Sequence, residues 1–289
     1  MNPVFKPALD ELFANGVTHP SSPWAGPLQK PVLIAFLVCF GVAWISLWLG
    51  IPDAENGLEL DLWFSAATAS VVGLARRLPA QNVLMSSLLI GAISLGISVV
   101  AQKTGMPFGP RIYTAPLGPK VLGVPWSVPL IWLVVIVTGR GVARLIMRPW
   151  RKTTYYGFRV IGLVCLLAVL FDAGLEPFAT RVKSYWLWET RGNVLNWYSA
   201  PWVNFLGWFV AALAILGFTT PWLINKQPVK QPADYHPLVV WLLLNSYLAT
   251  GNALHHLWAA VSFTLVVNAI LTIYALRGAR WVTNQGSHR

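Results

Sequence analysis

Residues 157–178 read GFRVIGLVCLLAVLFDAGLEPF, an apolar run that ends in two carboxyl groups. A run of this length is long enough to cross a bilayer as a helix, which needs about 20 residues. Asp172 and Glu176 lie four residues apart and so share one face of that helix, and Pro177 interrupts the regular hydrogen-bond pattern directly after them. Because charged groups in or near a bilayer are costly, this stretch predicts a membrane helix with a functional or paired carboxylate site at its end.

The composition of the whole chain is that of a polytopic membrane protein. Hydrophobic residues make up 56% of its 289 residues and charged residues only 11%, whereas a soluble domain carries about 25% charged residues. We expect an all-α transmembrane bundle of about eight spans, with a range of seven to nine. The expected spans are 31–51, 62–78, 82–101, 125–146, 157–178, 202–224, 237–252 and 254–276.

Basic residues are distributed unevenly between the connections. With eight spans and a cytoplasmic amino terminus, fifteen Lys and Arg residues fall on the cytoplasmic side and six on the outer side. This is the positive-inside bias, and it accounts for the net charge of +11 without a nucleic-acid partner. We therefore expect a protein of the cell membrane whose two termini lie on the cytoplasmic side. Its expected parts are a polar cytoplasmic segment over 1–30, one transmembrane domain over 31–276 and a basic cytoplasmic tail over 277–289.

Sequence motifs exclude several chemistries. Cys39 and Cys165 lie within apolar runs and are expected to be buried free thiols. His255 and His256 are adjacent, so a helix points them in different directions, and no histidine pair has metal-ligand spacing. We expect neither a metal nor a cofactor, which argues against a histidine-cluster oxygenase. The lack of an aspartate-rich Mg²⁺ motif argues against a prenyl transferase.

Two connections on the predicted outer side, 102–124 and 179–201, are rich in Pro, Gly and aromatic residues. Irregular backbone of this kind can enter a membrane protein where it lines a cavity, so we expect these loops to cap or line a site. Tyr113 could bind substrate there, and Glu189 beside Trp186 and Trp188 is a further possible acid. The alternative for these aromatic residues is the ordinary interfacial belt.

The polar residues of the spans also have ordinary explanations. Asp172 and Glu176 could pair with Arg181 or Arg191 at the interface instead of acting in catalysis. Asn204 could position a water molecule or simply join two helices. Arg140 and Arg144 mark the cytoplasmic end of a span, and their functional alternative is binding acidic lipid head groups.

A set of motifs in the middle of the chain resembles a known family. The pattern PFG…YT…LGPK…GVP…VPL…W over 107–132, the D…EP of 172–177, the WLW of 186–188 and the Y…P…NFLGW of 198–208 occur in the same order in the carotenoid biosynthesis membrane proteins that include the CruF-type carotenoid 1,2-hydratases. Arg111, Ser199 and Glu176 depart from that pattern, in which tyrosine, glycine and aspartate are more usual.

The resemblance implies a cofactor-independent hydro-lyase that adds water to the terminal isoprenoid double bond of an acyclic carotenoid. An acid protonates the double bond, and water captures the tertiary carbocation, which aromatic faces and nearby charges can stabilise. An apolar site favours the protonated, acidic form of a carboxyl group. The expected roles are proton donor for Asp172 or Glu176, with Glu189 in reserve, cation site for Tyr113, Trp186, Trp188 and Tyr198, and water positioning for Asn204.

Three other functions remain open from the sequence, one of which is a different isoprenoid-modifying enzyme on the same scaffold, such as an isomerase. The chain could be a non-catalytic membrane protein that binds a carotenoid or another long isoprenoid within the bilayer and presents it to a partner such as a carotenoid glycosyltransferase. It could also be a small-solute transporter, but the interrupted segments occur only in the middle of the chain, without the matched halves typical of transporters.

Overall fold

The structure is a computed structural model that describes residues 22, 24–51, 57–114, 117–189, 195–224 and 232–284, with side chains as far as Arg280. Its described part contains eight helices long and apolar enough to cross a membrane, which confirms the all-α bundle of eight spans. These are α2 (Ala25–Trp48), α3 (Leu58–Ala75), α4 (Ala80–Thr104), α5 (Ser127–Ile146), α6 (Tyr156–Pro177), α7 (Trp202–Leu223), α8 (His236–Leu254) and α9 (Trp258–Asn284).

Several expected boundaries differ from the structure by a few residues, and the start of the first span and the end of the last differ most. Helix α2 begins at Ala25, so the last residues of the expected polar segment 1–30 are helical and Pro31 lies inside the helix. Helix α9 continues to Asn284, beyond the expected start of the basic tail at 277. In both places the backbone hydrogen bonds of the helix continue past the apolar run. The end of a helix is defined by these bonds and not by the hydropathy of its side chains. Cys165 is buried as expected, whereas Cys39 is only half-buried.

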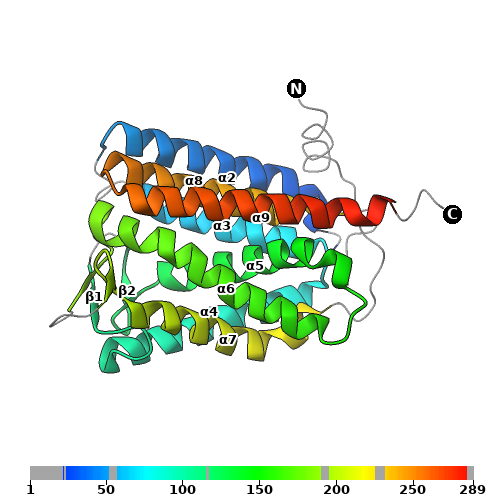
Figure 1. Cartoon of the computed structure of the whole chain (residues 1–289), viewed down its shortest axis with the longest axis horizontal. Coiled ribbons are helices and arrows are strands. Elements are labelled where there is room, and N and C mark those ends of the chain that lie inside the picture. The colour runs from blue at the N-terminus through cyan, green and yellow to red at the C-terminus, as the bar shows by residue number, and fades with distance from the viewer. Residues whose placement is uncertain are drawn as a thin grey trace.

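Helix α5 occupies the centre of the bundle and contacts α3, α4, α6, α8 and α9. Most of its residues are buried, as expected for a helix surrounded by other helices. Figure 1 shows α2 and α8 on one side of this helix and α4 and α7 on the other. Helices α2, α4 and α9 bury the smallest share of their apolar residues and turn the remainder outward, where lipid would lie.

The helices alternate in direction, so the bundle has two distinct ends. At one end, here called the basic end, α3, α5 and α7 finish and α4, α6 and α8 begin. At the opposite end, here called the strand end, short strands gather between the helices. In Figure 1 the strand end lies on the left, and α2 begins and α9 finishes on the right.

Six short strands of the described chain form three two-stranded antiparallel sheets at the strand end. They are β1 (Arg111–Tyr113), β2 (Lys120–Val121), β3 (Val124–Pro125), β4 (Trp186–Trp188), β5 (Asn196–Trp197) and β6 (Ala200–Pro201). The pairing of β1 with β4 joins the two loops that the sequence singled out. Its register sets Arg111 opposite Trp188 and Tyr113 opposite Trp186. Residues i and i+2 of a strand share a face, so all four side chains lie on one side of this ribbon.

A close contact fixes the first of these loops against α7. A Cβ built on Gly207 would lie 2.7 Å from the Pro107 carbonyl oxygen, so only glycine allows the loop to approach this closely. Gly105, with φ of +76°, ends α4 just before the loop. The α4–β1 connection is therefore held on α7 before the chain enters β1.

A buried ion pair ties the second loop to the far side of the bundle. Lys183 Nζ lies 2.6 Å from Glu59 Oε1 at the start of α3, and the Tyr247 hydroxyl of α8 donates to the same oxygen at 2.8 Å. Lys183 follows the π-helical turn η2 (Phe178–Val182), which continues α6. The segment between α6 and β4 is thus fixed at both of its ends.

Candidate active site

Two carboxyl groups lie at the strand end of α6, inside the protein. Asp172 and Glu176 are 0% and 1% exposed, and they share the face of α6 that turns toward α7 and the strands. Every residue from Phe171 to Pro177 is buried. This end of α6 is therefore enclosed by protein, and the carboxyl groups do not face solvent.

Asn204, in the first turn of α7, connects the two carboxyl groups. Its Nδ2 donates to Asp172 Oδ2 at 2.6 Å and to Glu176 Oε1 at 3.1 Å. The reversed amide would set an oxygen against two carboxyl oxygens, so the network fixes the orientation of this side chain. One amide thereby holds both acids in a defined relation to each other.

Glu176 receives two further hydrogen bonds from strand β4. The indole N–H groups of Trp186 and Trp188 both donate to Glu176 Oε2, at 3.2 and 3.1 Å. The two tryptophans are two residues apart and so lie on the same face of the strand. With Asn204 on its other oxygen, Glu176 has N–H donors on both of its oxygens.

Arg111 of β1 provides a buried positive charge beside the carboxyl pair. It is 6% exposed, donates to the Tyr113 hydroxyl at 2.7 Å, and acts electrostatically on both Asp172 and Glu176. Its guanidinium carbon also lies over four aromatic rings. Those of Phe108, Tyr113, Trp186 and Trp188 have centroids at 4.7, 5.0, 5.2 and 5.6 Å. These distances are in the range of cation–π contacts.

Two buried oxygens of this cluster have no hydrogen-bond partner among the described residues. They are Asp172 Oδ1 and Asn204 Oδ1. An unpaired buried oxygen is costly, and most buried polar atoms in folded proteins have a partner. Both atoms can accept a hydrogen bond, and a protonated Asp172 could donate one. The pair is therefore suited to a water molecule or a hydroxyl group.

The structure brings six of the eight sequence candidates together: Asp172, Glu176, Asn204, Trp186, Trp188 and, through Arg111, Tyr113. The other two lie elsewhere. Glu189 is exposed, and its backbone N–H donates to the Pro110 carbonyl at 3.0 Å. The Tyr198 hydroxyl accepts the Ala260 backbone N–H of α9 at 3.2 Å.

Of the two suggested arginine partners of the carboxyl pair, the structure describes only Arg181, which contacts another residue. Arg181 donates to Ser199 Oγ at 2.9 Å, and Arg191 lies outside the described residues. Arg111, which the sequence did not point to, is the arginine whose charge acts on the two carboxyl groups. The signal that could have identified it is the alternation in RIY and WLW, which predicts two short strands with Arg111, Tyr113, Trp186 and Trp188 on matching faces.

The rings expected to stabilise a substrate cation lie beside a cation of the protein itself, Arg111. One face of Tyr113, Trp186 and Trp188 is directed at Arg111, and the N–H groups of the tryptophans are used by Glu176. Among the described residues there is no cluster of three or more His, Cys, Asp or Glu side chains placed to hold a metal ion. The chemical resources of the site are thus two carboxyl groups, one amide, one guanidinium and the surrounding rings.

Comparison with known proteins identifies the family. A family model described as carotenoid biosynthesis protein matches residues 58–271, which include every residue of the cluster. Bisanhydrobacterioruberin hydratase of Haloarcula japonica is 30% identical over 129 residues, which are 43% of this chain and 41% of that protein. The alignment thus spans less than half of that relative's length. No solved structure matches the chain. Because the family model covers well over half of its residues, this multi-pass membrane protein belongs to the carotenoid biosynthesis protein family.

Proposed function

We propose that this protein is a hydratase that adds water to the terminal isoprenoid double bond of an acyclic carotenoid. The observation that carries the proposal is the pair of buried, unpartnered oxygens, Asp172 Oδ1 and Asn204 Oδ1, within a carboxyl pair that is otherwise fully hydrogen-bonded. The relative that aligns with part of this chain is named as a hydratase, and this supports the same reaction class.

Hydrogen bonding distinguishes the two carboxyl groups. Glu176 accepts N–H donors on both oxygens and is therefore suited to remain a carboxylate. Asp172 has one oxygen without a partner, which leaves room for a proton that can be given away. Arg111 supplies one positive charge, so the cluster is neutral when Glu176 is ionised and Asp172 is protonated. We assign Asp172 as the proton donor and Glu176 as its fixed anionic neighbour.

The reaction then follows in two balanced steps. The Asp172 proton moves to the less substituted carbon of the double bond, and a tertiary carbocation forms at the other carbon beside the negative charges of Asp172 and Glu176. A water molecule held by Asn204 Oδ1 attacks the cation, and the proton that it loses returns to Asp172. The product is a tertiary alcohol, and the acid is regenerated.

The second candidate function is carotenoid binding without chemistry. It is favoured by the near-complete burial of Asp172 and Glu176, which a substrate could not touch without a rearrangement of the surrounding residues. In that case the charged cluster would serve only to attach the two loops to the bundle. A hydratase would lose its product when the acids are substituted, whereas a binding protein would form no product with or without them.

The test is expression in a bacterial host that accumulates lycopene, with pigments analysed by liquid chromatography and mass spectrometry. We expect a product heavier by one water from the wild type and none from Asp172→Asn. Glu176→Gln should reduce the product strongly. Glu189→Gln is the matched control, because it removes an exposed carboxylate at the same end of the bundle and should leave product formation unchanged.

The same experiment separates the outcomes. Equal hydration by wild type and Asp172→Asn, with both proteins folded in the membrane, would refute the assignment of the acid. Carotenoid that copurifies with the wild type, without any hydrated product from lycopene or, in a second host that accumulates it, from bisanhydrobacterioruberin, would favour the binding function.

A further inference from the structure

A pocket of about 290 Å³ opens at the basic end, opposite the carboxyl cluster. It lies between α3, α5, the start of α8 and the segment 232–235 that leads into α8. Its charged lining consists of Arg77, Arg140, Arg144, Arg148, Arg151 and Asp234. Five arginines against one carboxylate give this pocket a strongly positive potential.

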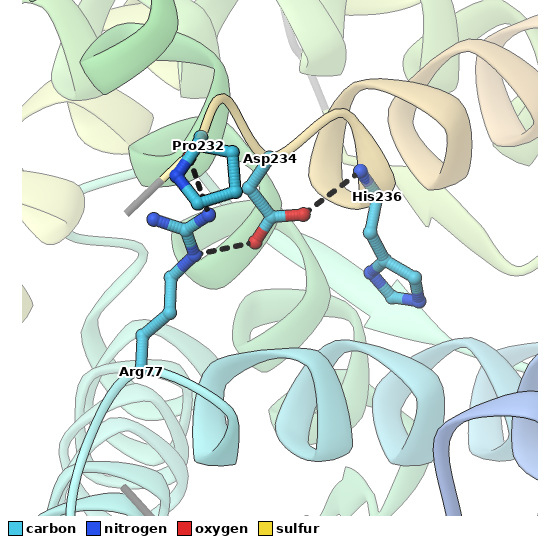
Figure 2. A network of polar contacts seen from close by, with 4 residues as sticks. All are labelled: Arg77, Pro232, Asp234 and His236. Atoms are coloured by element: carbon cyan, nitrogen blue, oxygen red, sulfur yellow. Dashed lines mark hydrogen bonds and ion pairs between the residues drawn. The ribbon is translucent and has the colours of Figure 1, made fainter. Parts of the chain in front are cut away.

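The one carboxylate is already engaged by its neighbours. Arg77 Nε lies 2.8 Å from Asp234 Oδ2, and the backbone N–H of His236 donates to Asp234 Oδ1 at 3.2 Å. Figure 2 shows Arg77 reaching Asp234 and also the Pro232 carbonyl, which it meets at 3.1 Å. Burial by itself would raise the pKa of Asp234, but the charges of Arg77 and His236 outweigh this effect and hold the pKa below its ordinary value. Asp234 thus balances Arg77, whereas Arg140, Arg144 and Arg151 have no carboxylate partner in the part of the chain that the structure describes.

Those remaining arginines are directed into the same space. Arg140, Arg144 and Arg148 follow at four-residue intervals and so lie along one side of α5 and its continuation. Arg140 donates to the Leu223 carbonyl at the end of α7. Arg144 and Arg151 form no ion pair with a carboxylate in the described part of the chain. Neighbouring positive charges without a counter-charge repel one another, and an anion bound between them would remove that cost.

We propose that this pocket binds a phosphate group. Guanidinium groups form paired hydrogen bonds with phosphate oxygens, and several arginines suit a group with several charged oxygens better than a single carboxylate. Apolar side chains of Leu74, Leu78 and Leu145 share the lining, so the phosphate can carry an apolar neighbour. Because the pocket lies where membrane-spanning helices end, an anionic phospholipid is the favoured source and a soluble phosphate compound is the other. This site is independent of the proposed hydratase reaction.

The experiment compares two double variants of the full chain in neutral detergent. Arg144→Gln with Arg151→Gln removes two exposed charges of the pocket, and Lys152→Gln with Arg159→Gln removes two exposed charges from the same end but outside it. The probes are dioleoylphosphatidylglycerol, dioleoylphosphatidylcholine and inorganic phosphate. Binding is counted by native mass spectrometry and followed by the thermal unfolding midpoint, which rises when a ligand binds the folded state.

We expect the wild type and the Lys152/Arg159 variant to bind phosphatidylglycerol in preference to phosphatidylcholine. The Arg144/Arg151 variant should bind phosphatidylglycerol about ten-fold or more weakly, since hydrogen bonds to charged groups are lost. The thermal unfolding midpoint of the wild type could instead rise with inorganic phosphate and not with phosphatidylglycerol. Such a rise, absent from the Arg144/Arg151 variant, would support the phosphate site and identify a soluble source. Equal losses in both double variants, or no preference of the wild type for either phosphate probe over phosphatidylcholine, would overturn the proposal. If the double variant is unstable, Arg151→Gln alone replaces it with the same expected direction.

Discussion

Removal of the Arg111 charge should destabilise the strand end of the bundle. Arg111 is 6% exposed and acts on two buried carboxyl groups, so Arg111→Gln leaves negative charge in the interior without a counter-charge. Removing one member of a directly contacting buried ion pair costs about 3–5 kcal/mol, and since Arg111 acts on the carboxyl groups without such a contact, about 3 kcal/mol is the upper limit that we expect here. The hydrogen bond to Tyr113 and the contacts with four rings belong to the same interaction, so their energies are not added to this figure.

The assay is reversible unfolding in mixed micelles with increasing sodium dodecyl sulfate, followed by tryptophan fluorescence. Arg181→Gln is the matched control, because Arg181 is an exposed arginine at the same end and donates to Ser199 Oγ. Exposed polar contacts of this kind contribute less than about 1 kcal/mol. We therefore expect the free energy of unfolding to fall several times further for Arg111→Gln than for Arg181→Gln.

A double-mutant cycle tests whether Arg111 acts as the counter-charge. In a Glu176→Gln background the carboxylate that needs Arg111 is gone, so Arg111→Gln should cost less than it does in the wild type. Residues in one charged network are coupled by about 0.5–3 kcal/mol. A loss of less than about 1 kcal/mol in the single variant, or additive losses in the cycle, would refute the role assigned to Arg111.

Two further predictions concern the loop contact on α7 and the ion pair at the basic end. Gly207→Ala sets a Cβ 2.7 Å from the Pro107 carbonyl oxygen, so it should lower the free energy of unfolding by about 1–3 kcal/mol and also reduce the yield of hydrated product. The control is Gly217→Ala on the same helix, whose Cβ meets nothing within 4 Å and which should leave both quantities nearly unchanged. Equal effects of the two alanines would contradict the close-contact argument. Asp234 has a folded-state pKa below its ordinary value of 3.8, so its contribution to stability is present above that pH and is lost as the pH falls through the lower value. Asp234→Asn should therefore reduce the acid-induced loss of stability in unfolding curves between pH 5 and 2, and an unchanged acid loss would exclude the ion pair with Arg77 as its source.

The sequence predicted the spans well because bilayer thickness fixes their length and hydropathy. The expected span 157–178 corresponds to α6 (Tyr156–Pro177), and 202–224 corresponds to α7 (Trp202–Leu223). The four-residue spacing of Asp172 and Glu176 correctly predicted that they share a helix face. The same reasoning could not tell that Glu189 and Tyr198 lie apart from the other candidates, because residue type and spacing within a loop do not reveal which side chains the folded loop turns toward the bundle.

What the sequence by itself determined is the class of the protein: its apolar runs require helices that satisfy their own backbone hydrogen bonds in lipid, and eight such runs make an eight-helix bundle. The composition of the site depended on tertiary structure, because its parts are distant in the chain. Pairing of β1 with β4 places Arg111 over Trp186 and Trp188, and packing of α7 on α6 places Asn204 between two carboxyl groups. Local propensity contains no information about such contacts. They form in the folded protein because a polar or charged group buried away from water is costly unless another group pairs with it or hydrogen-bonds to it.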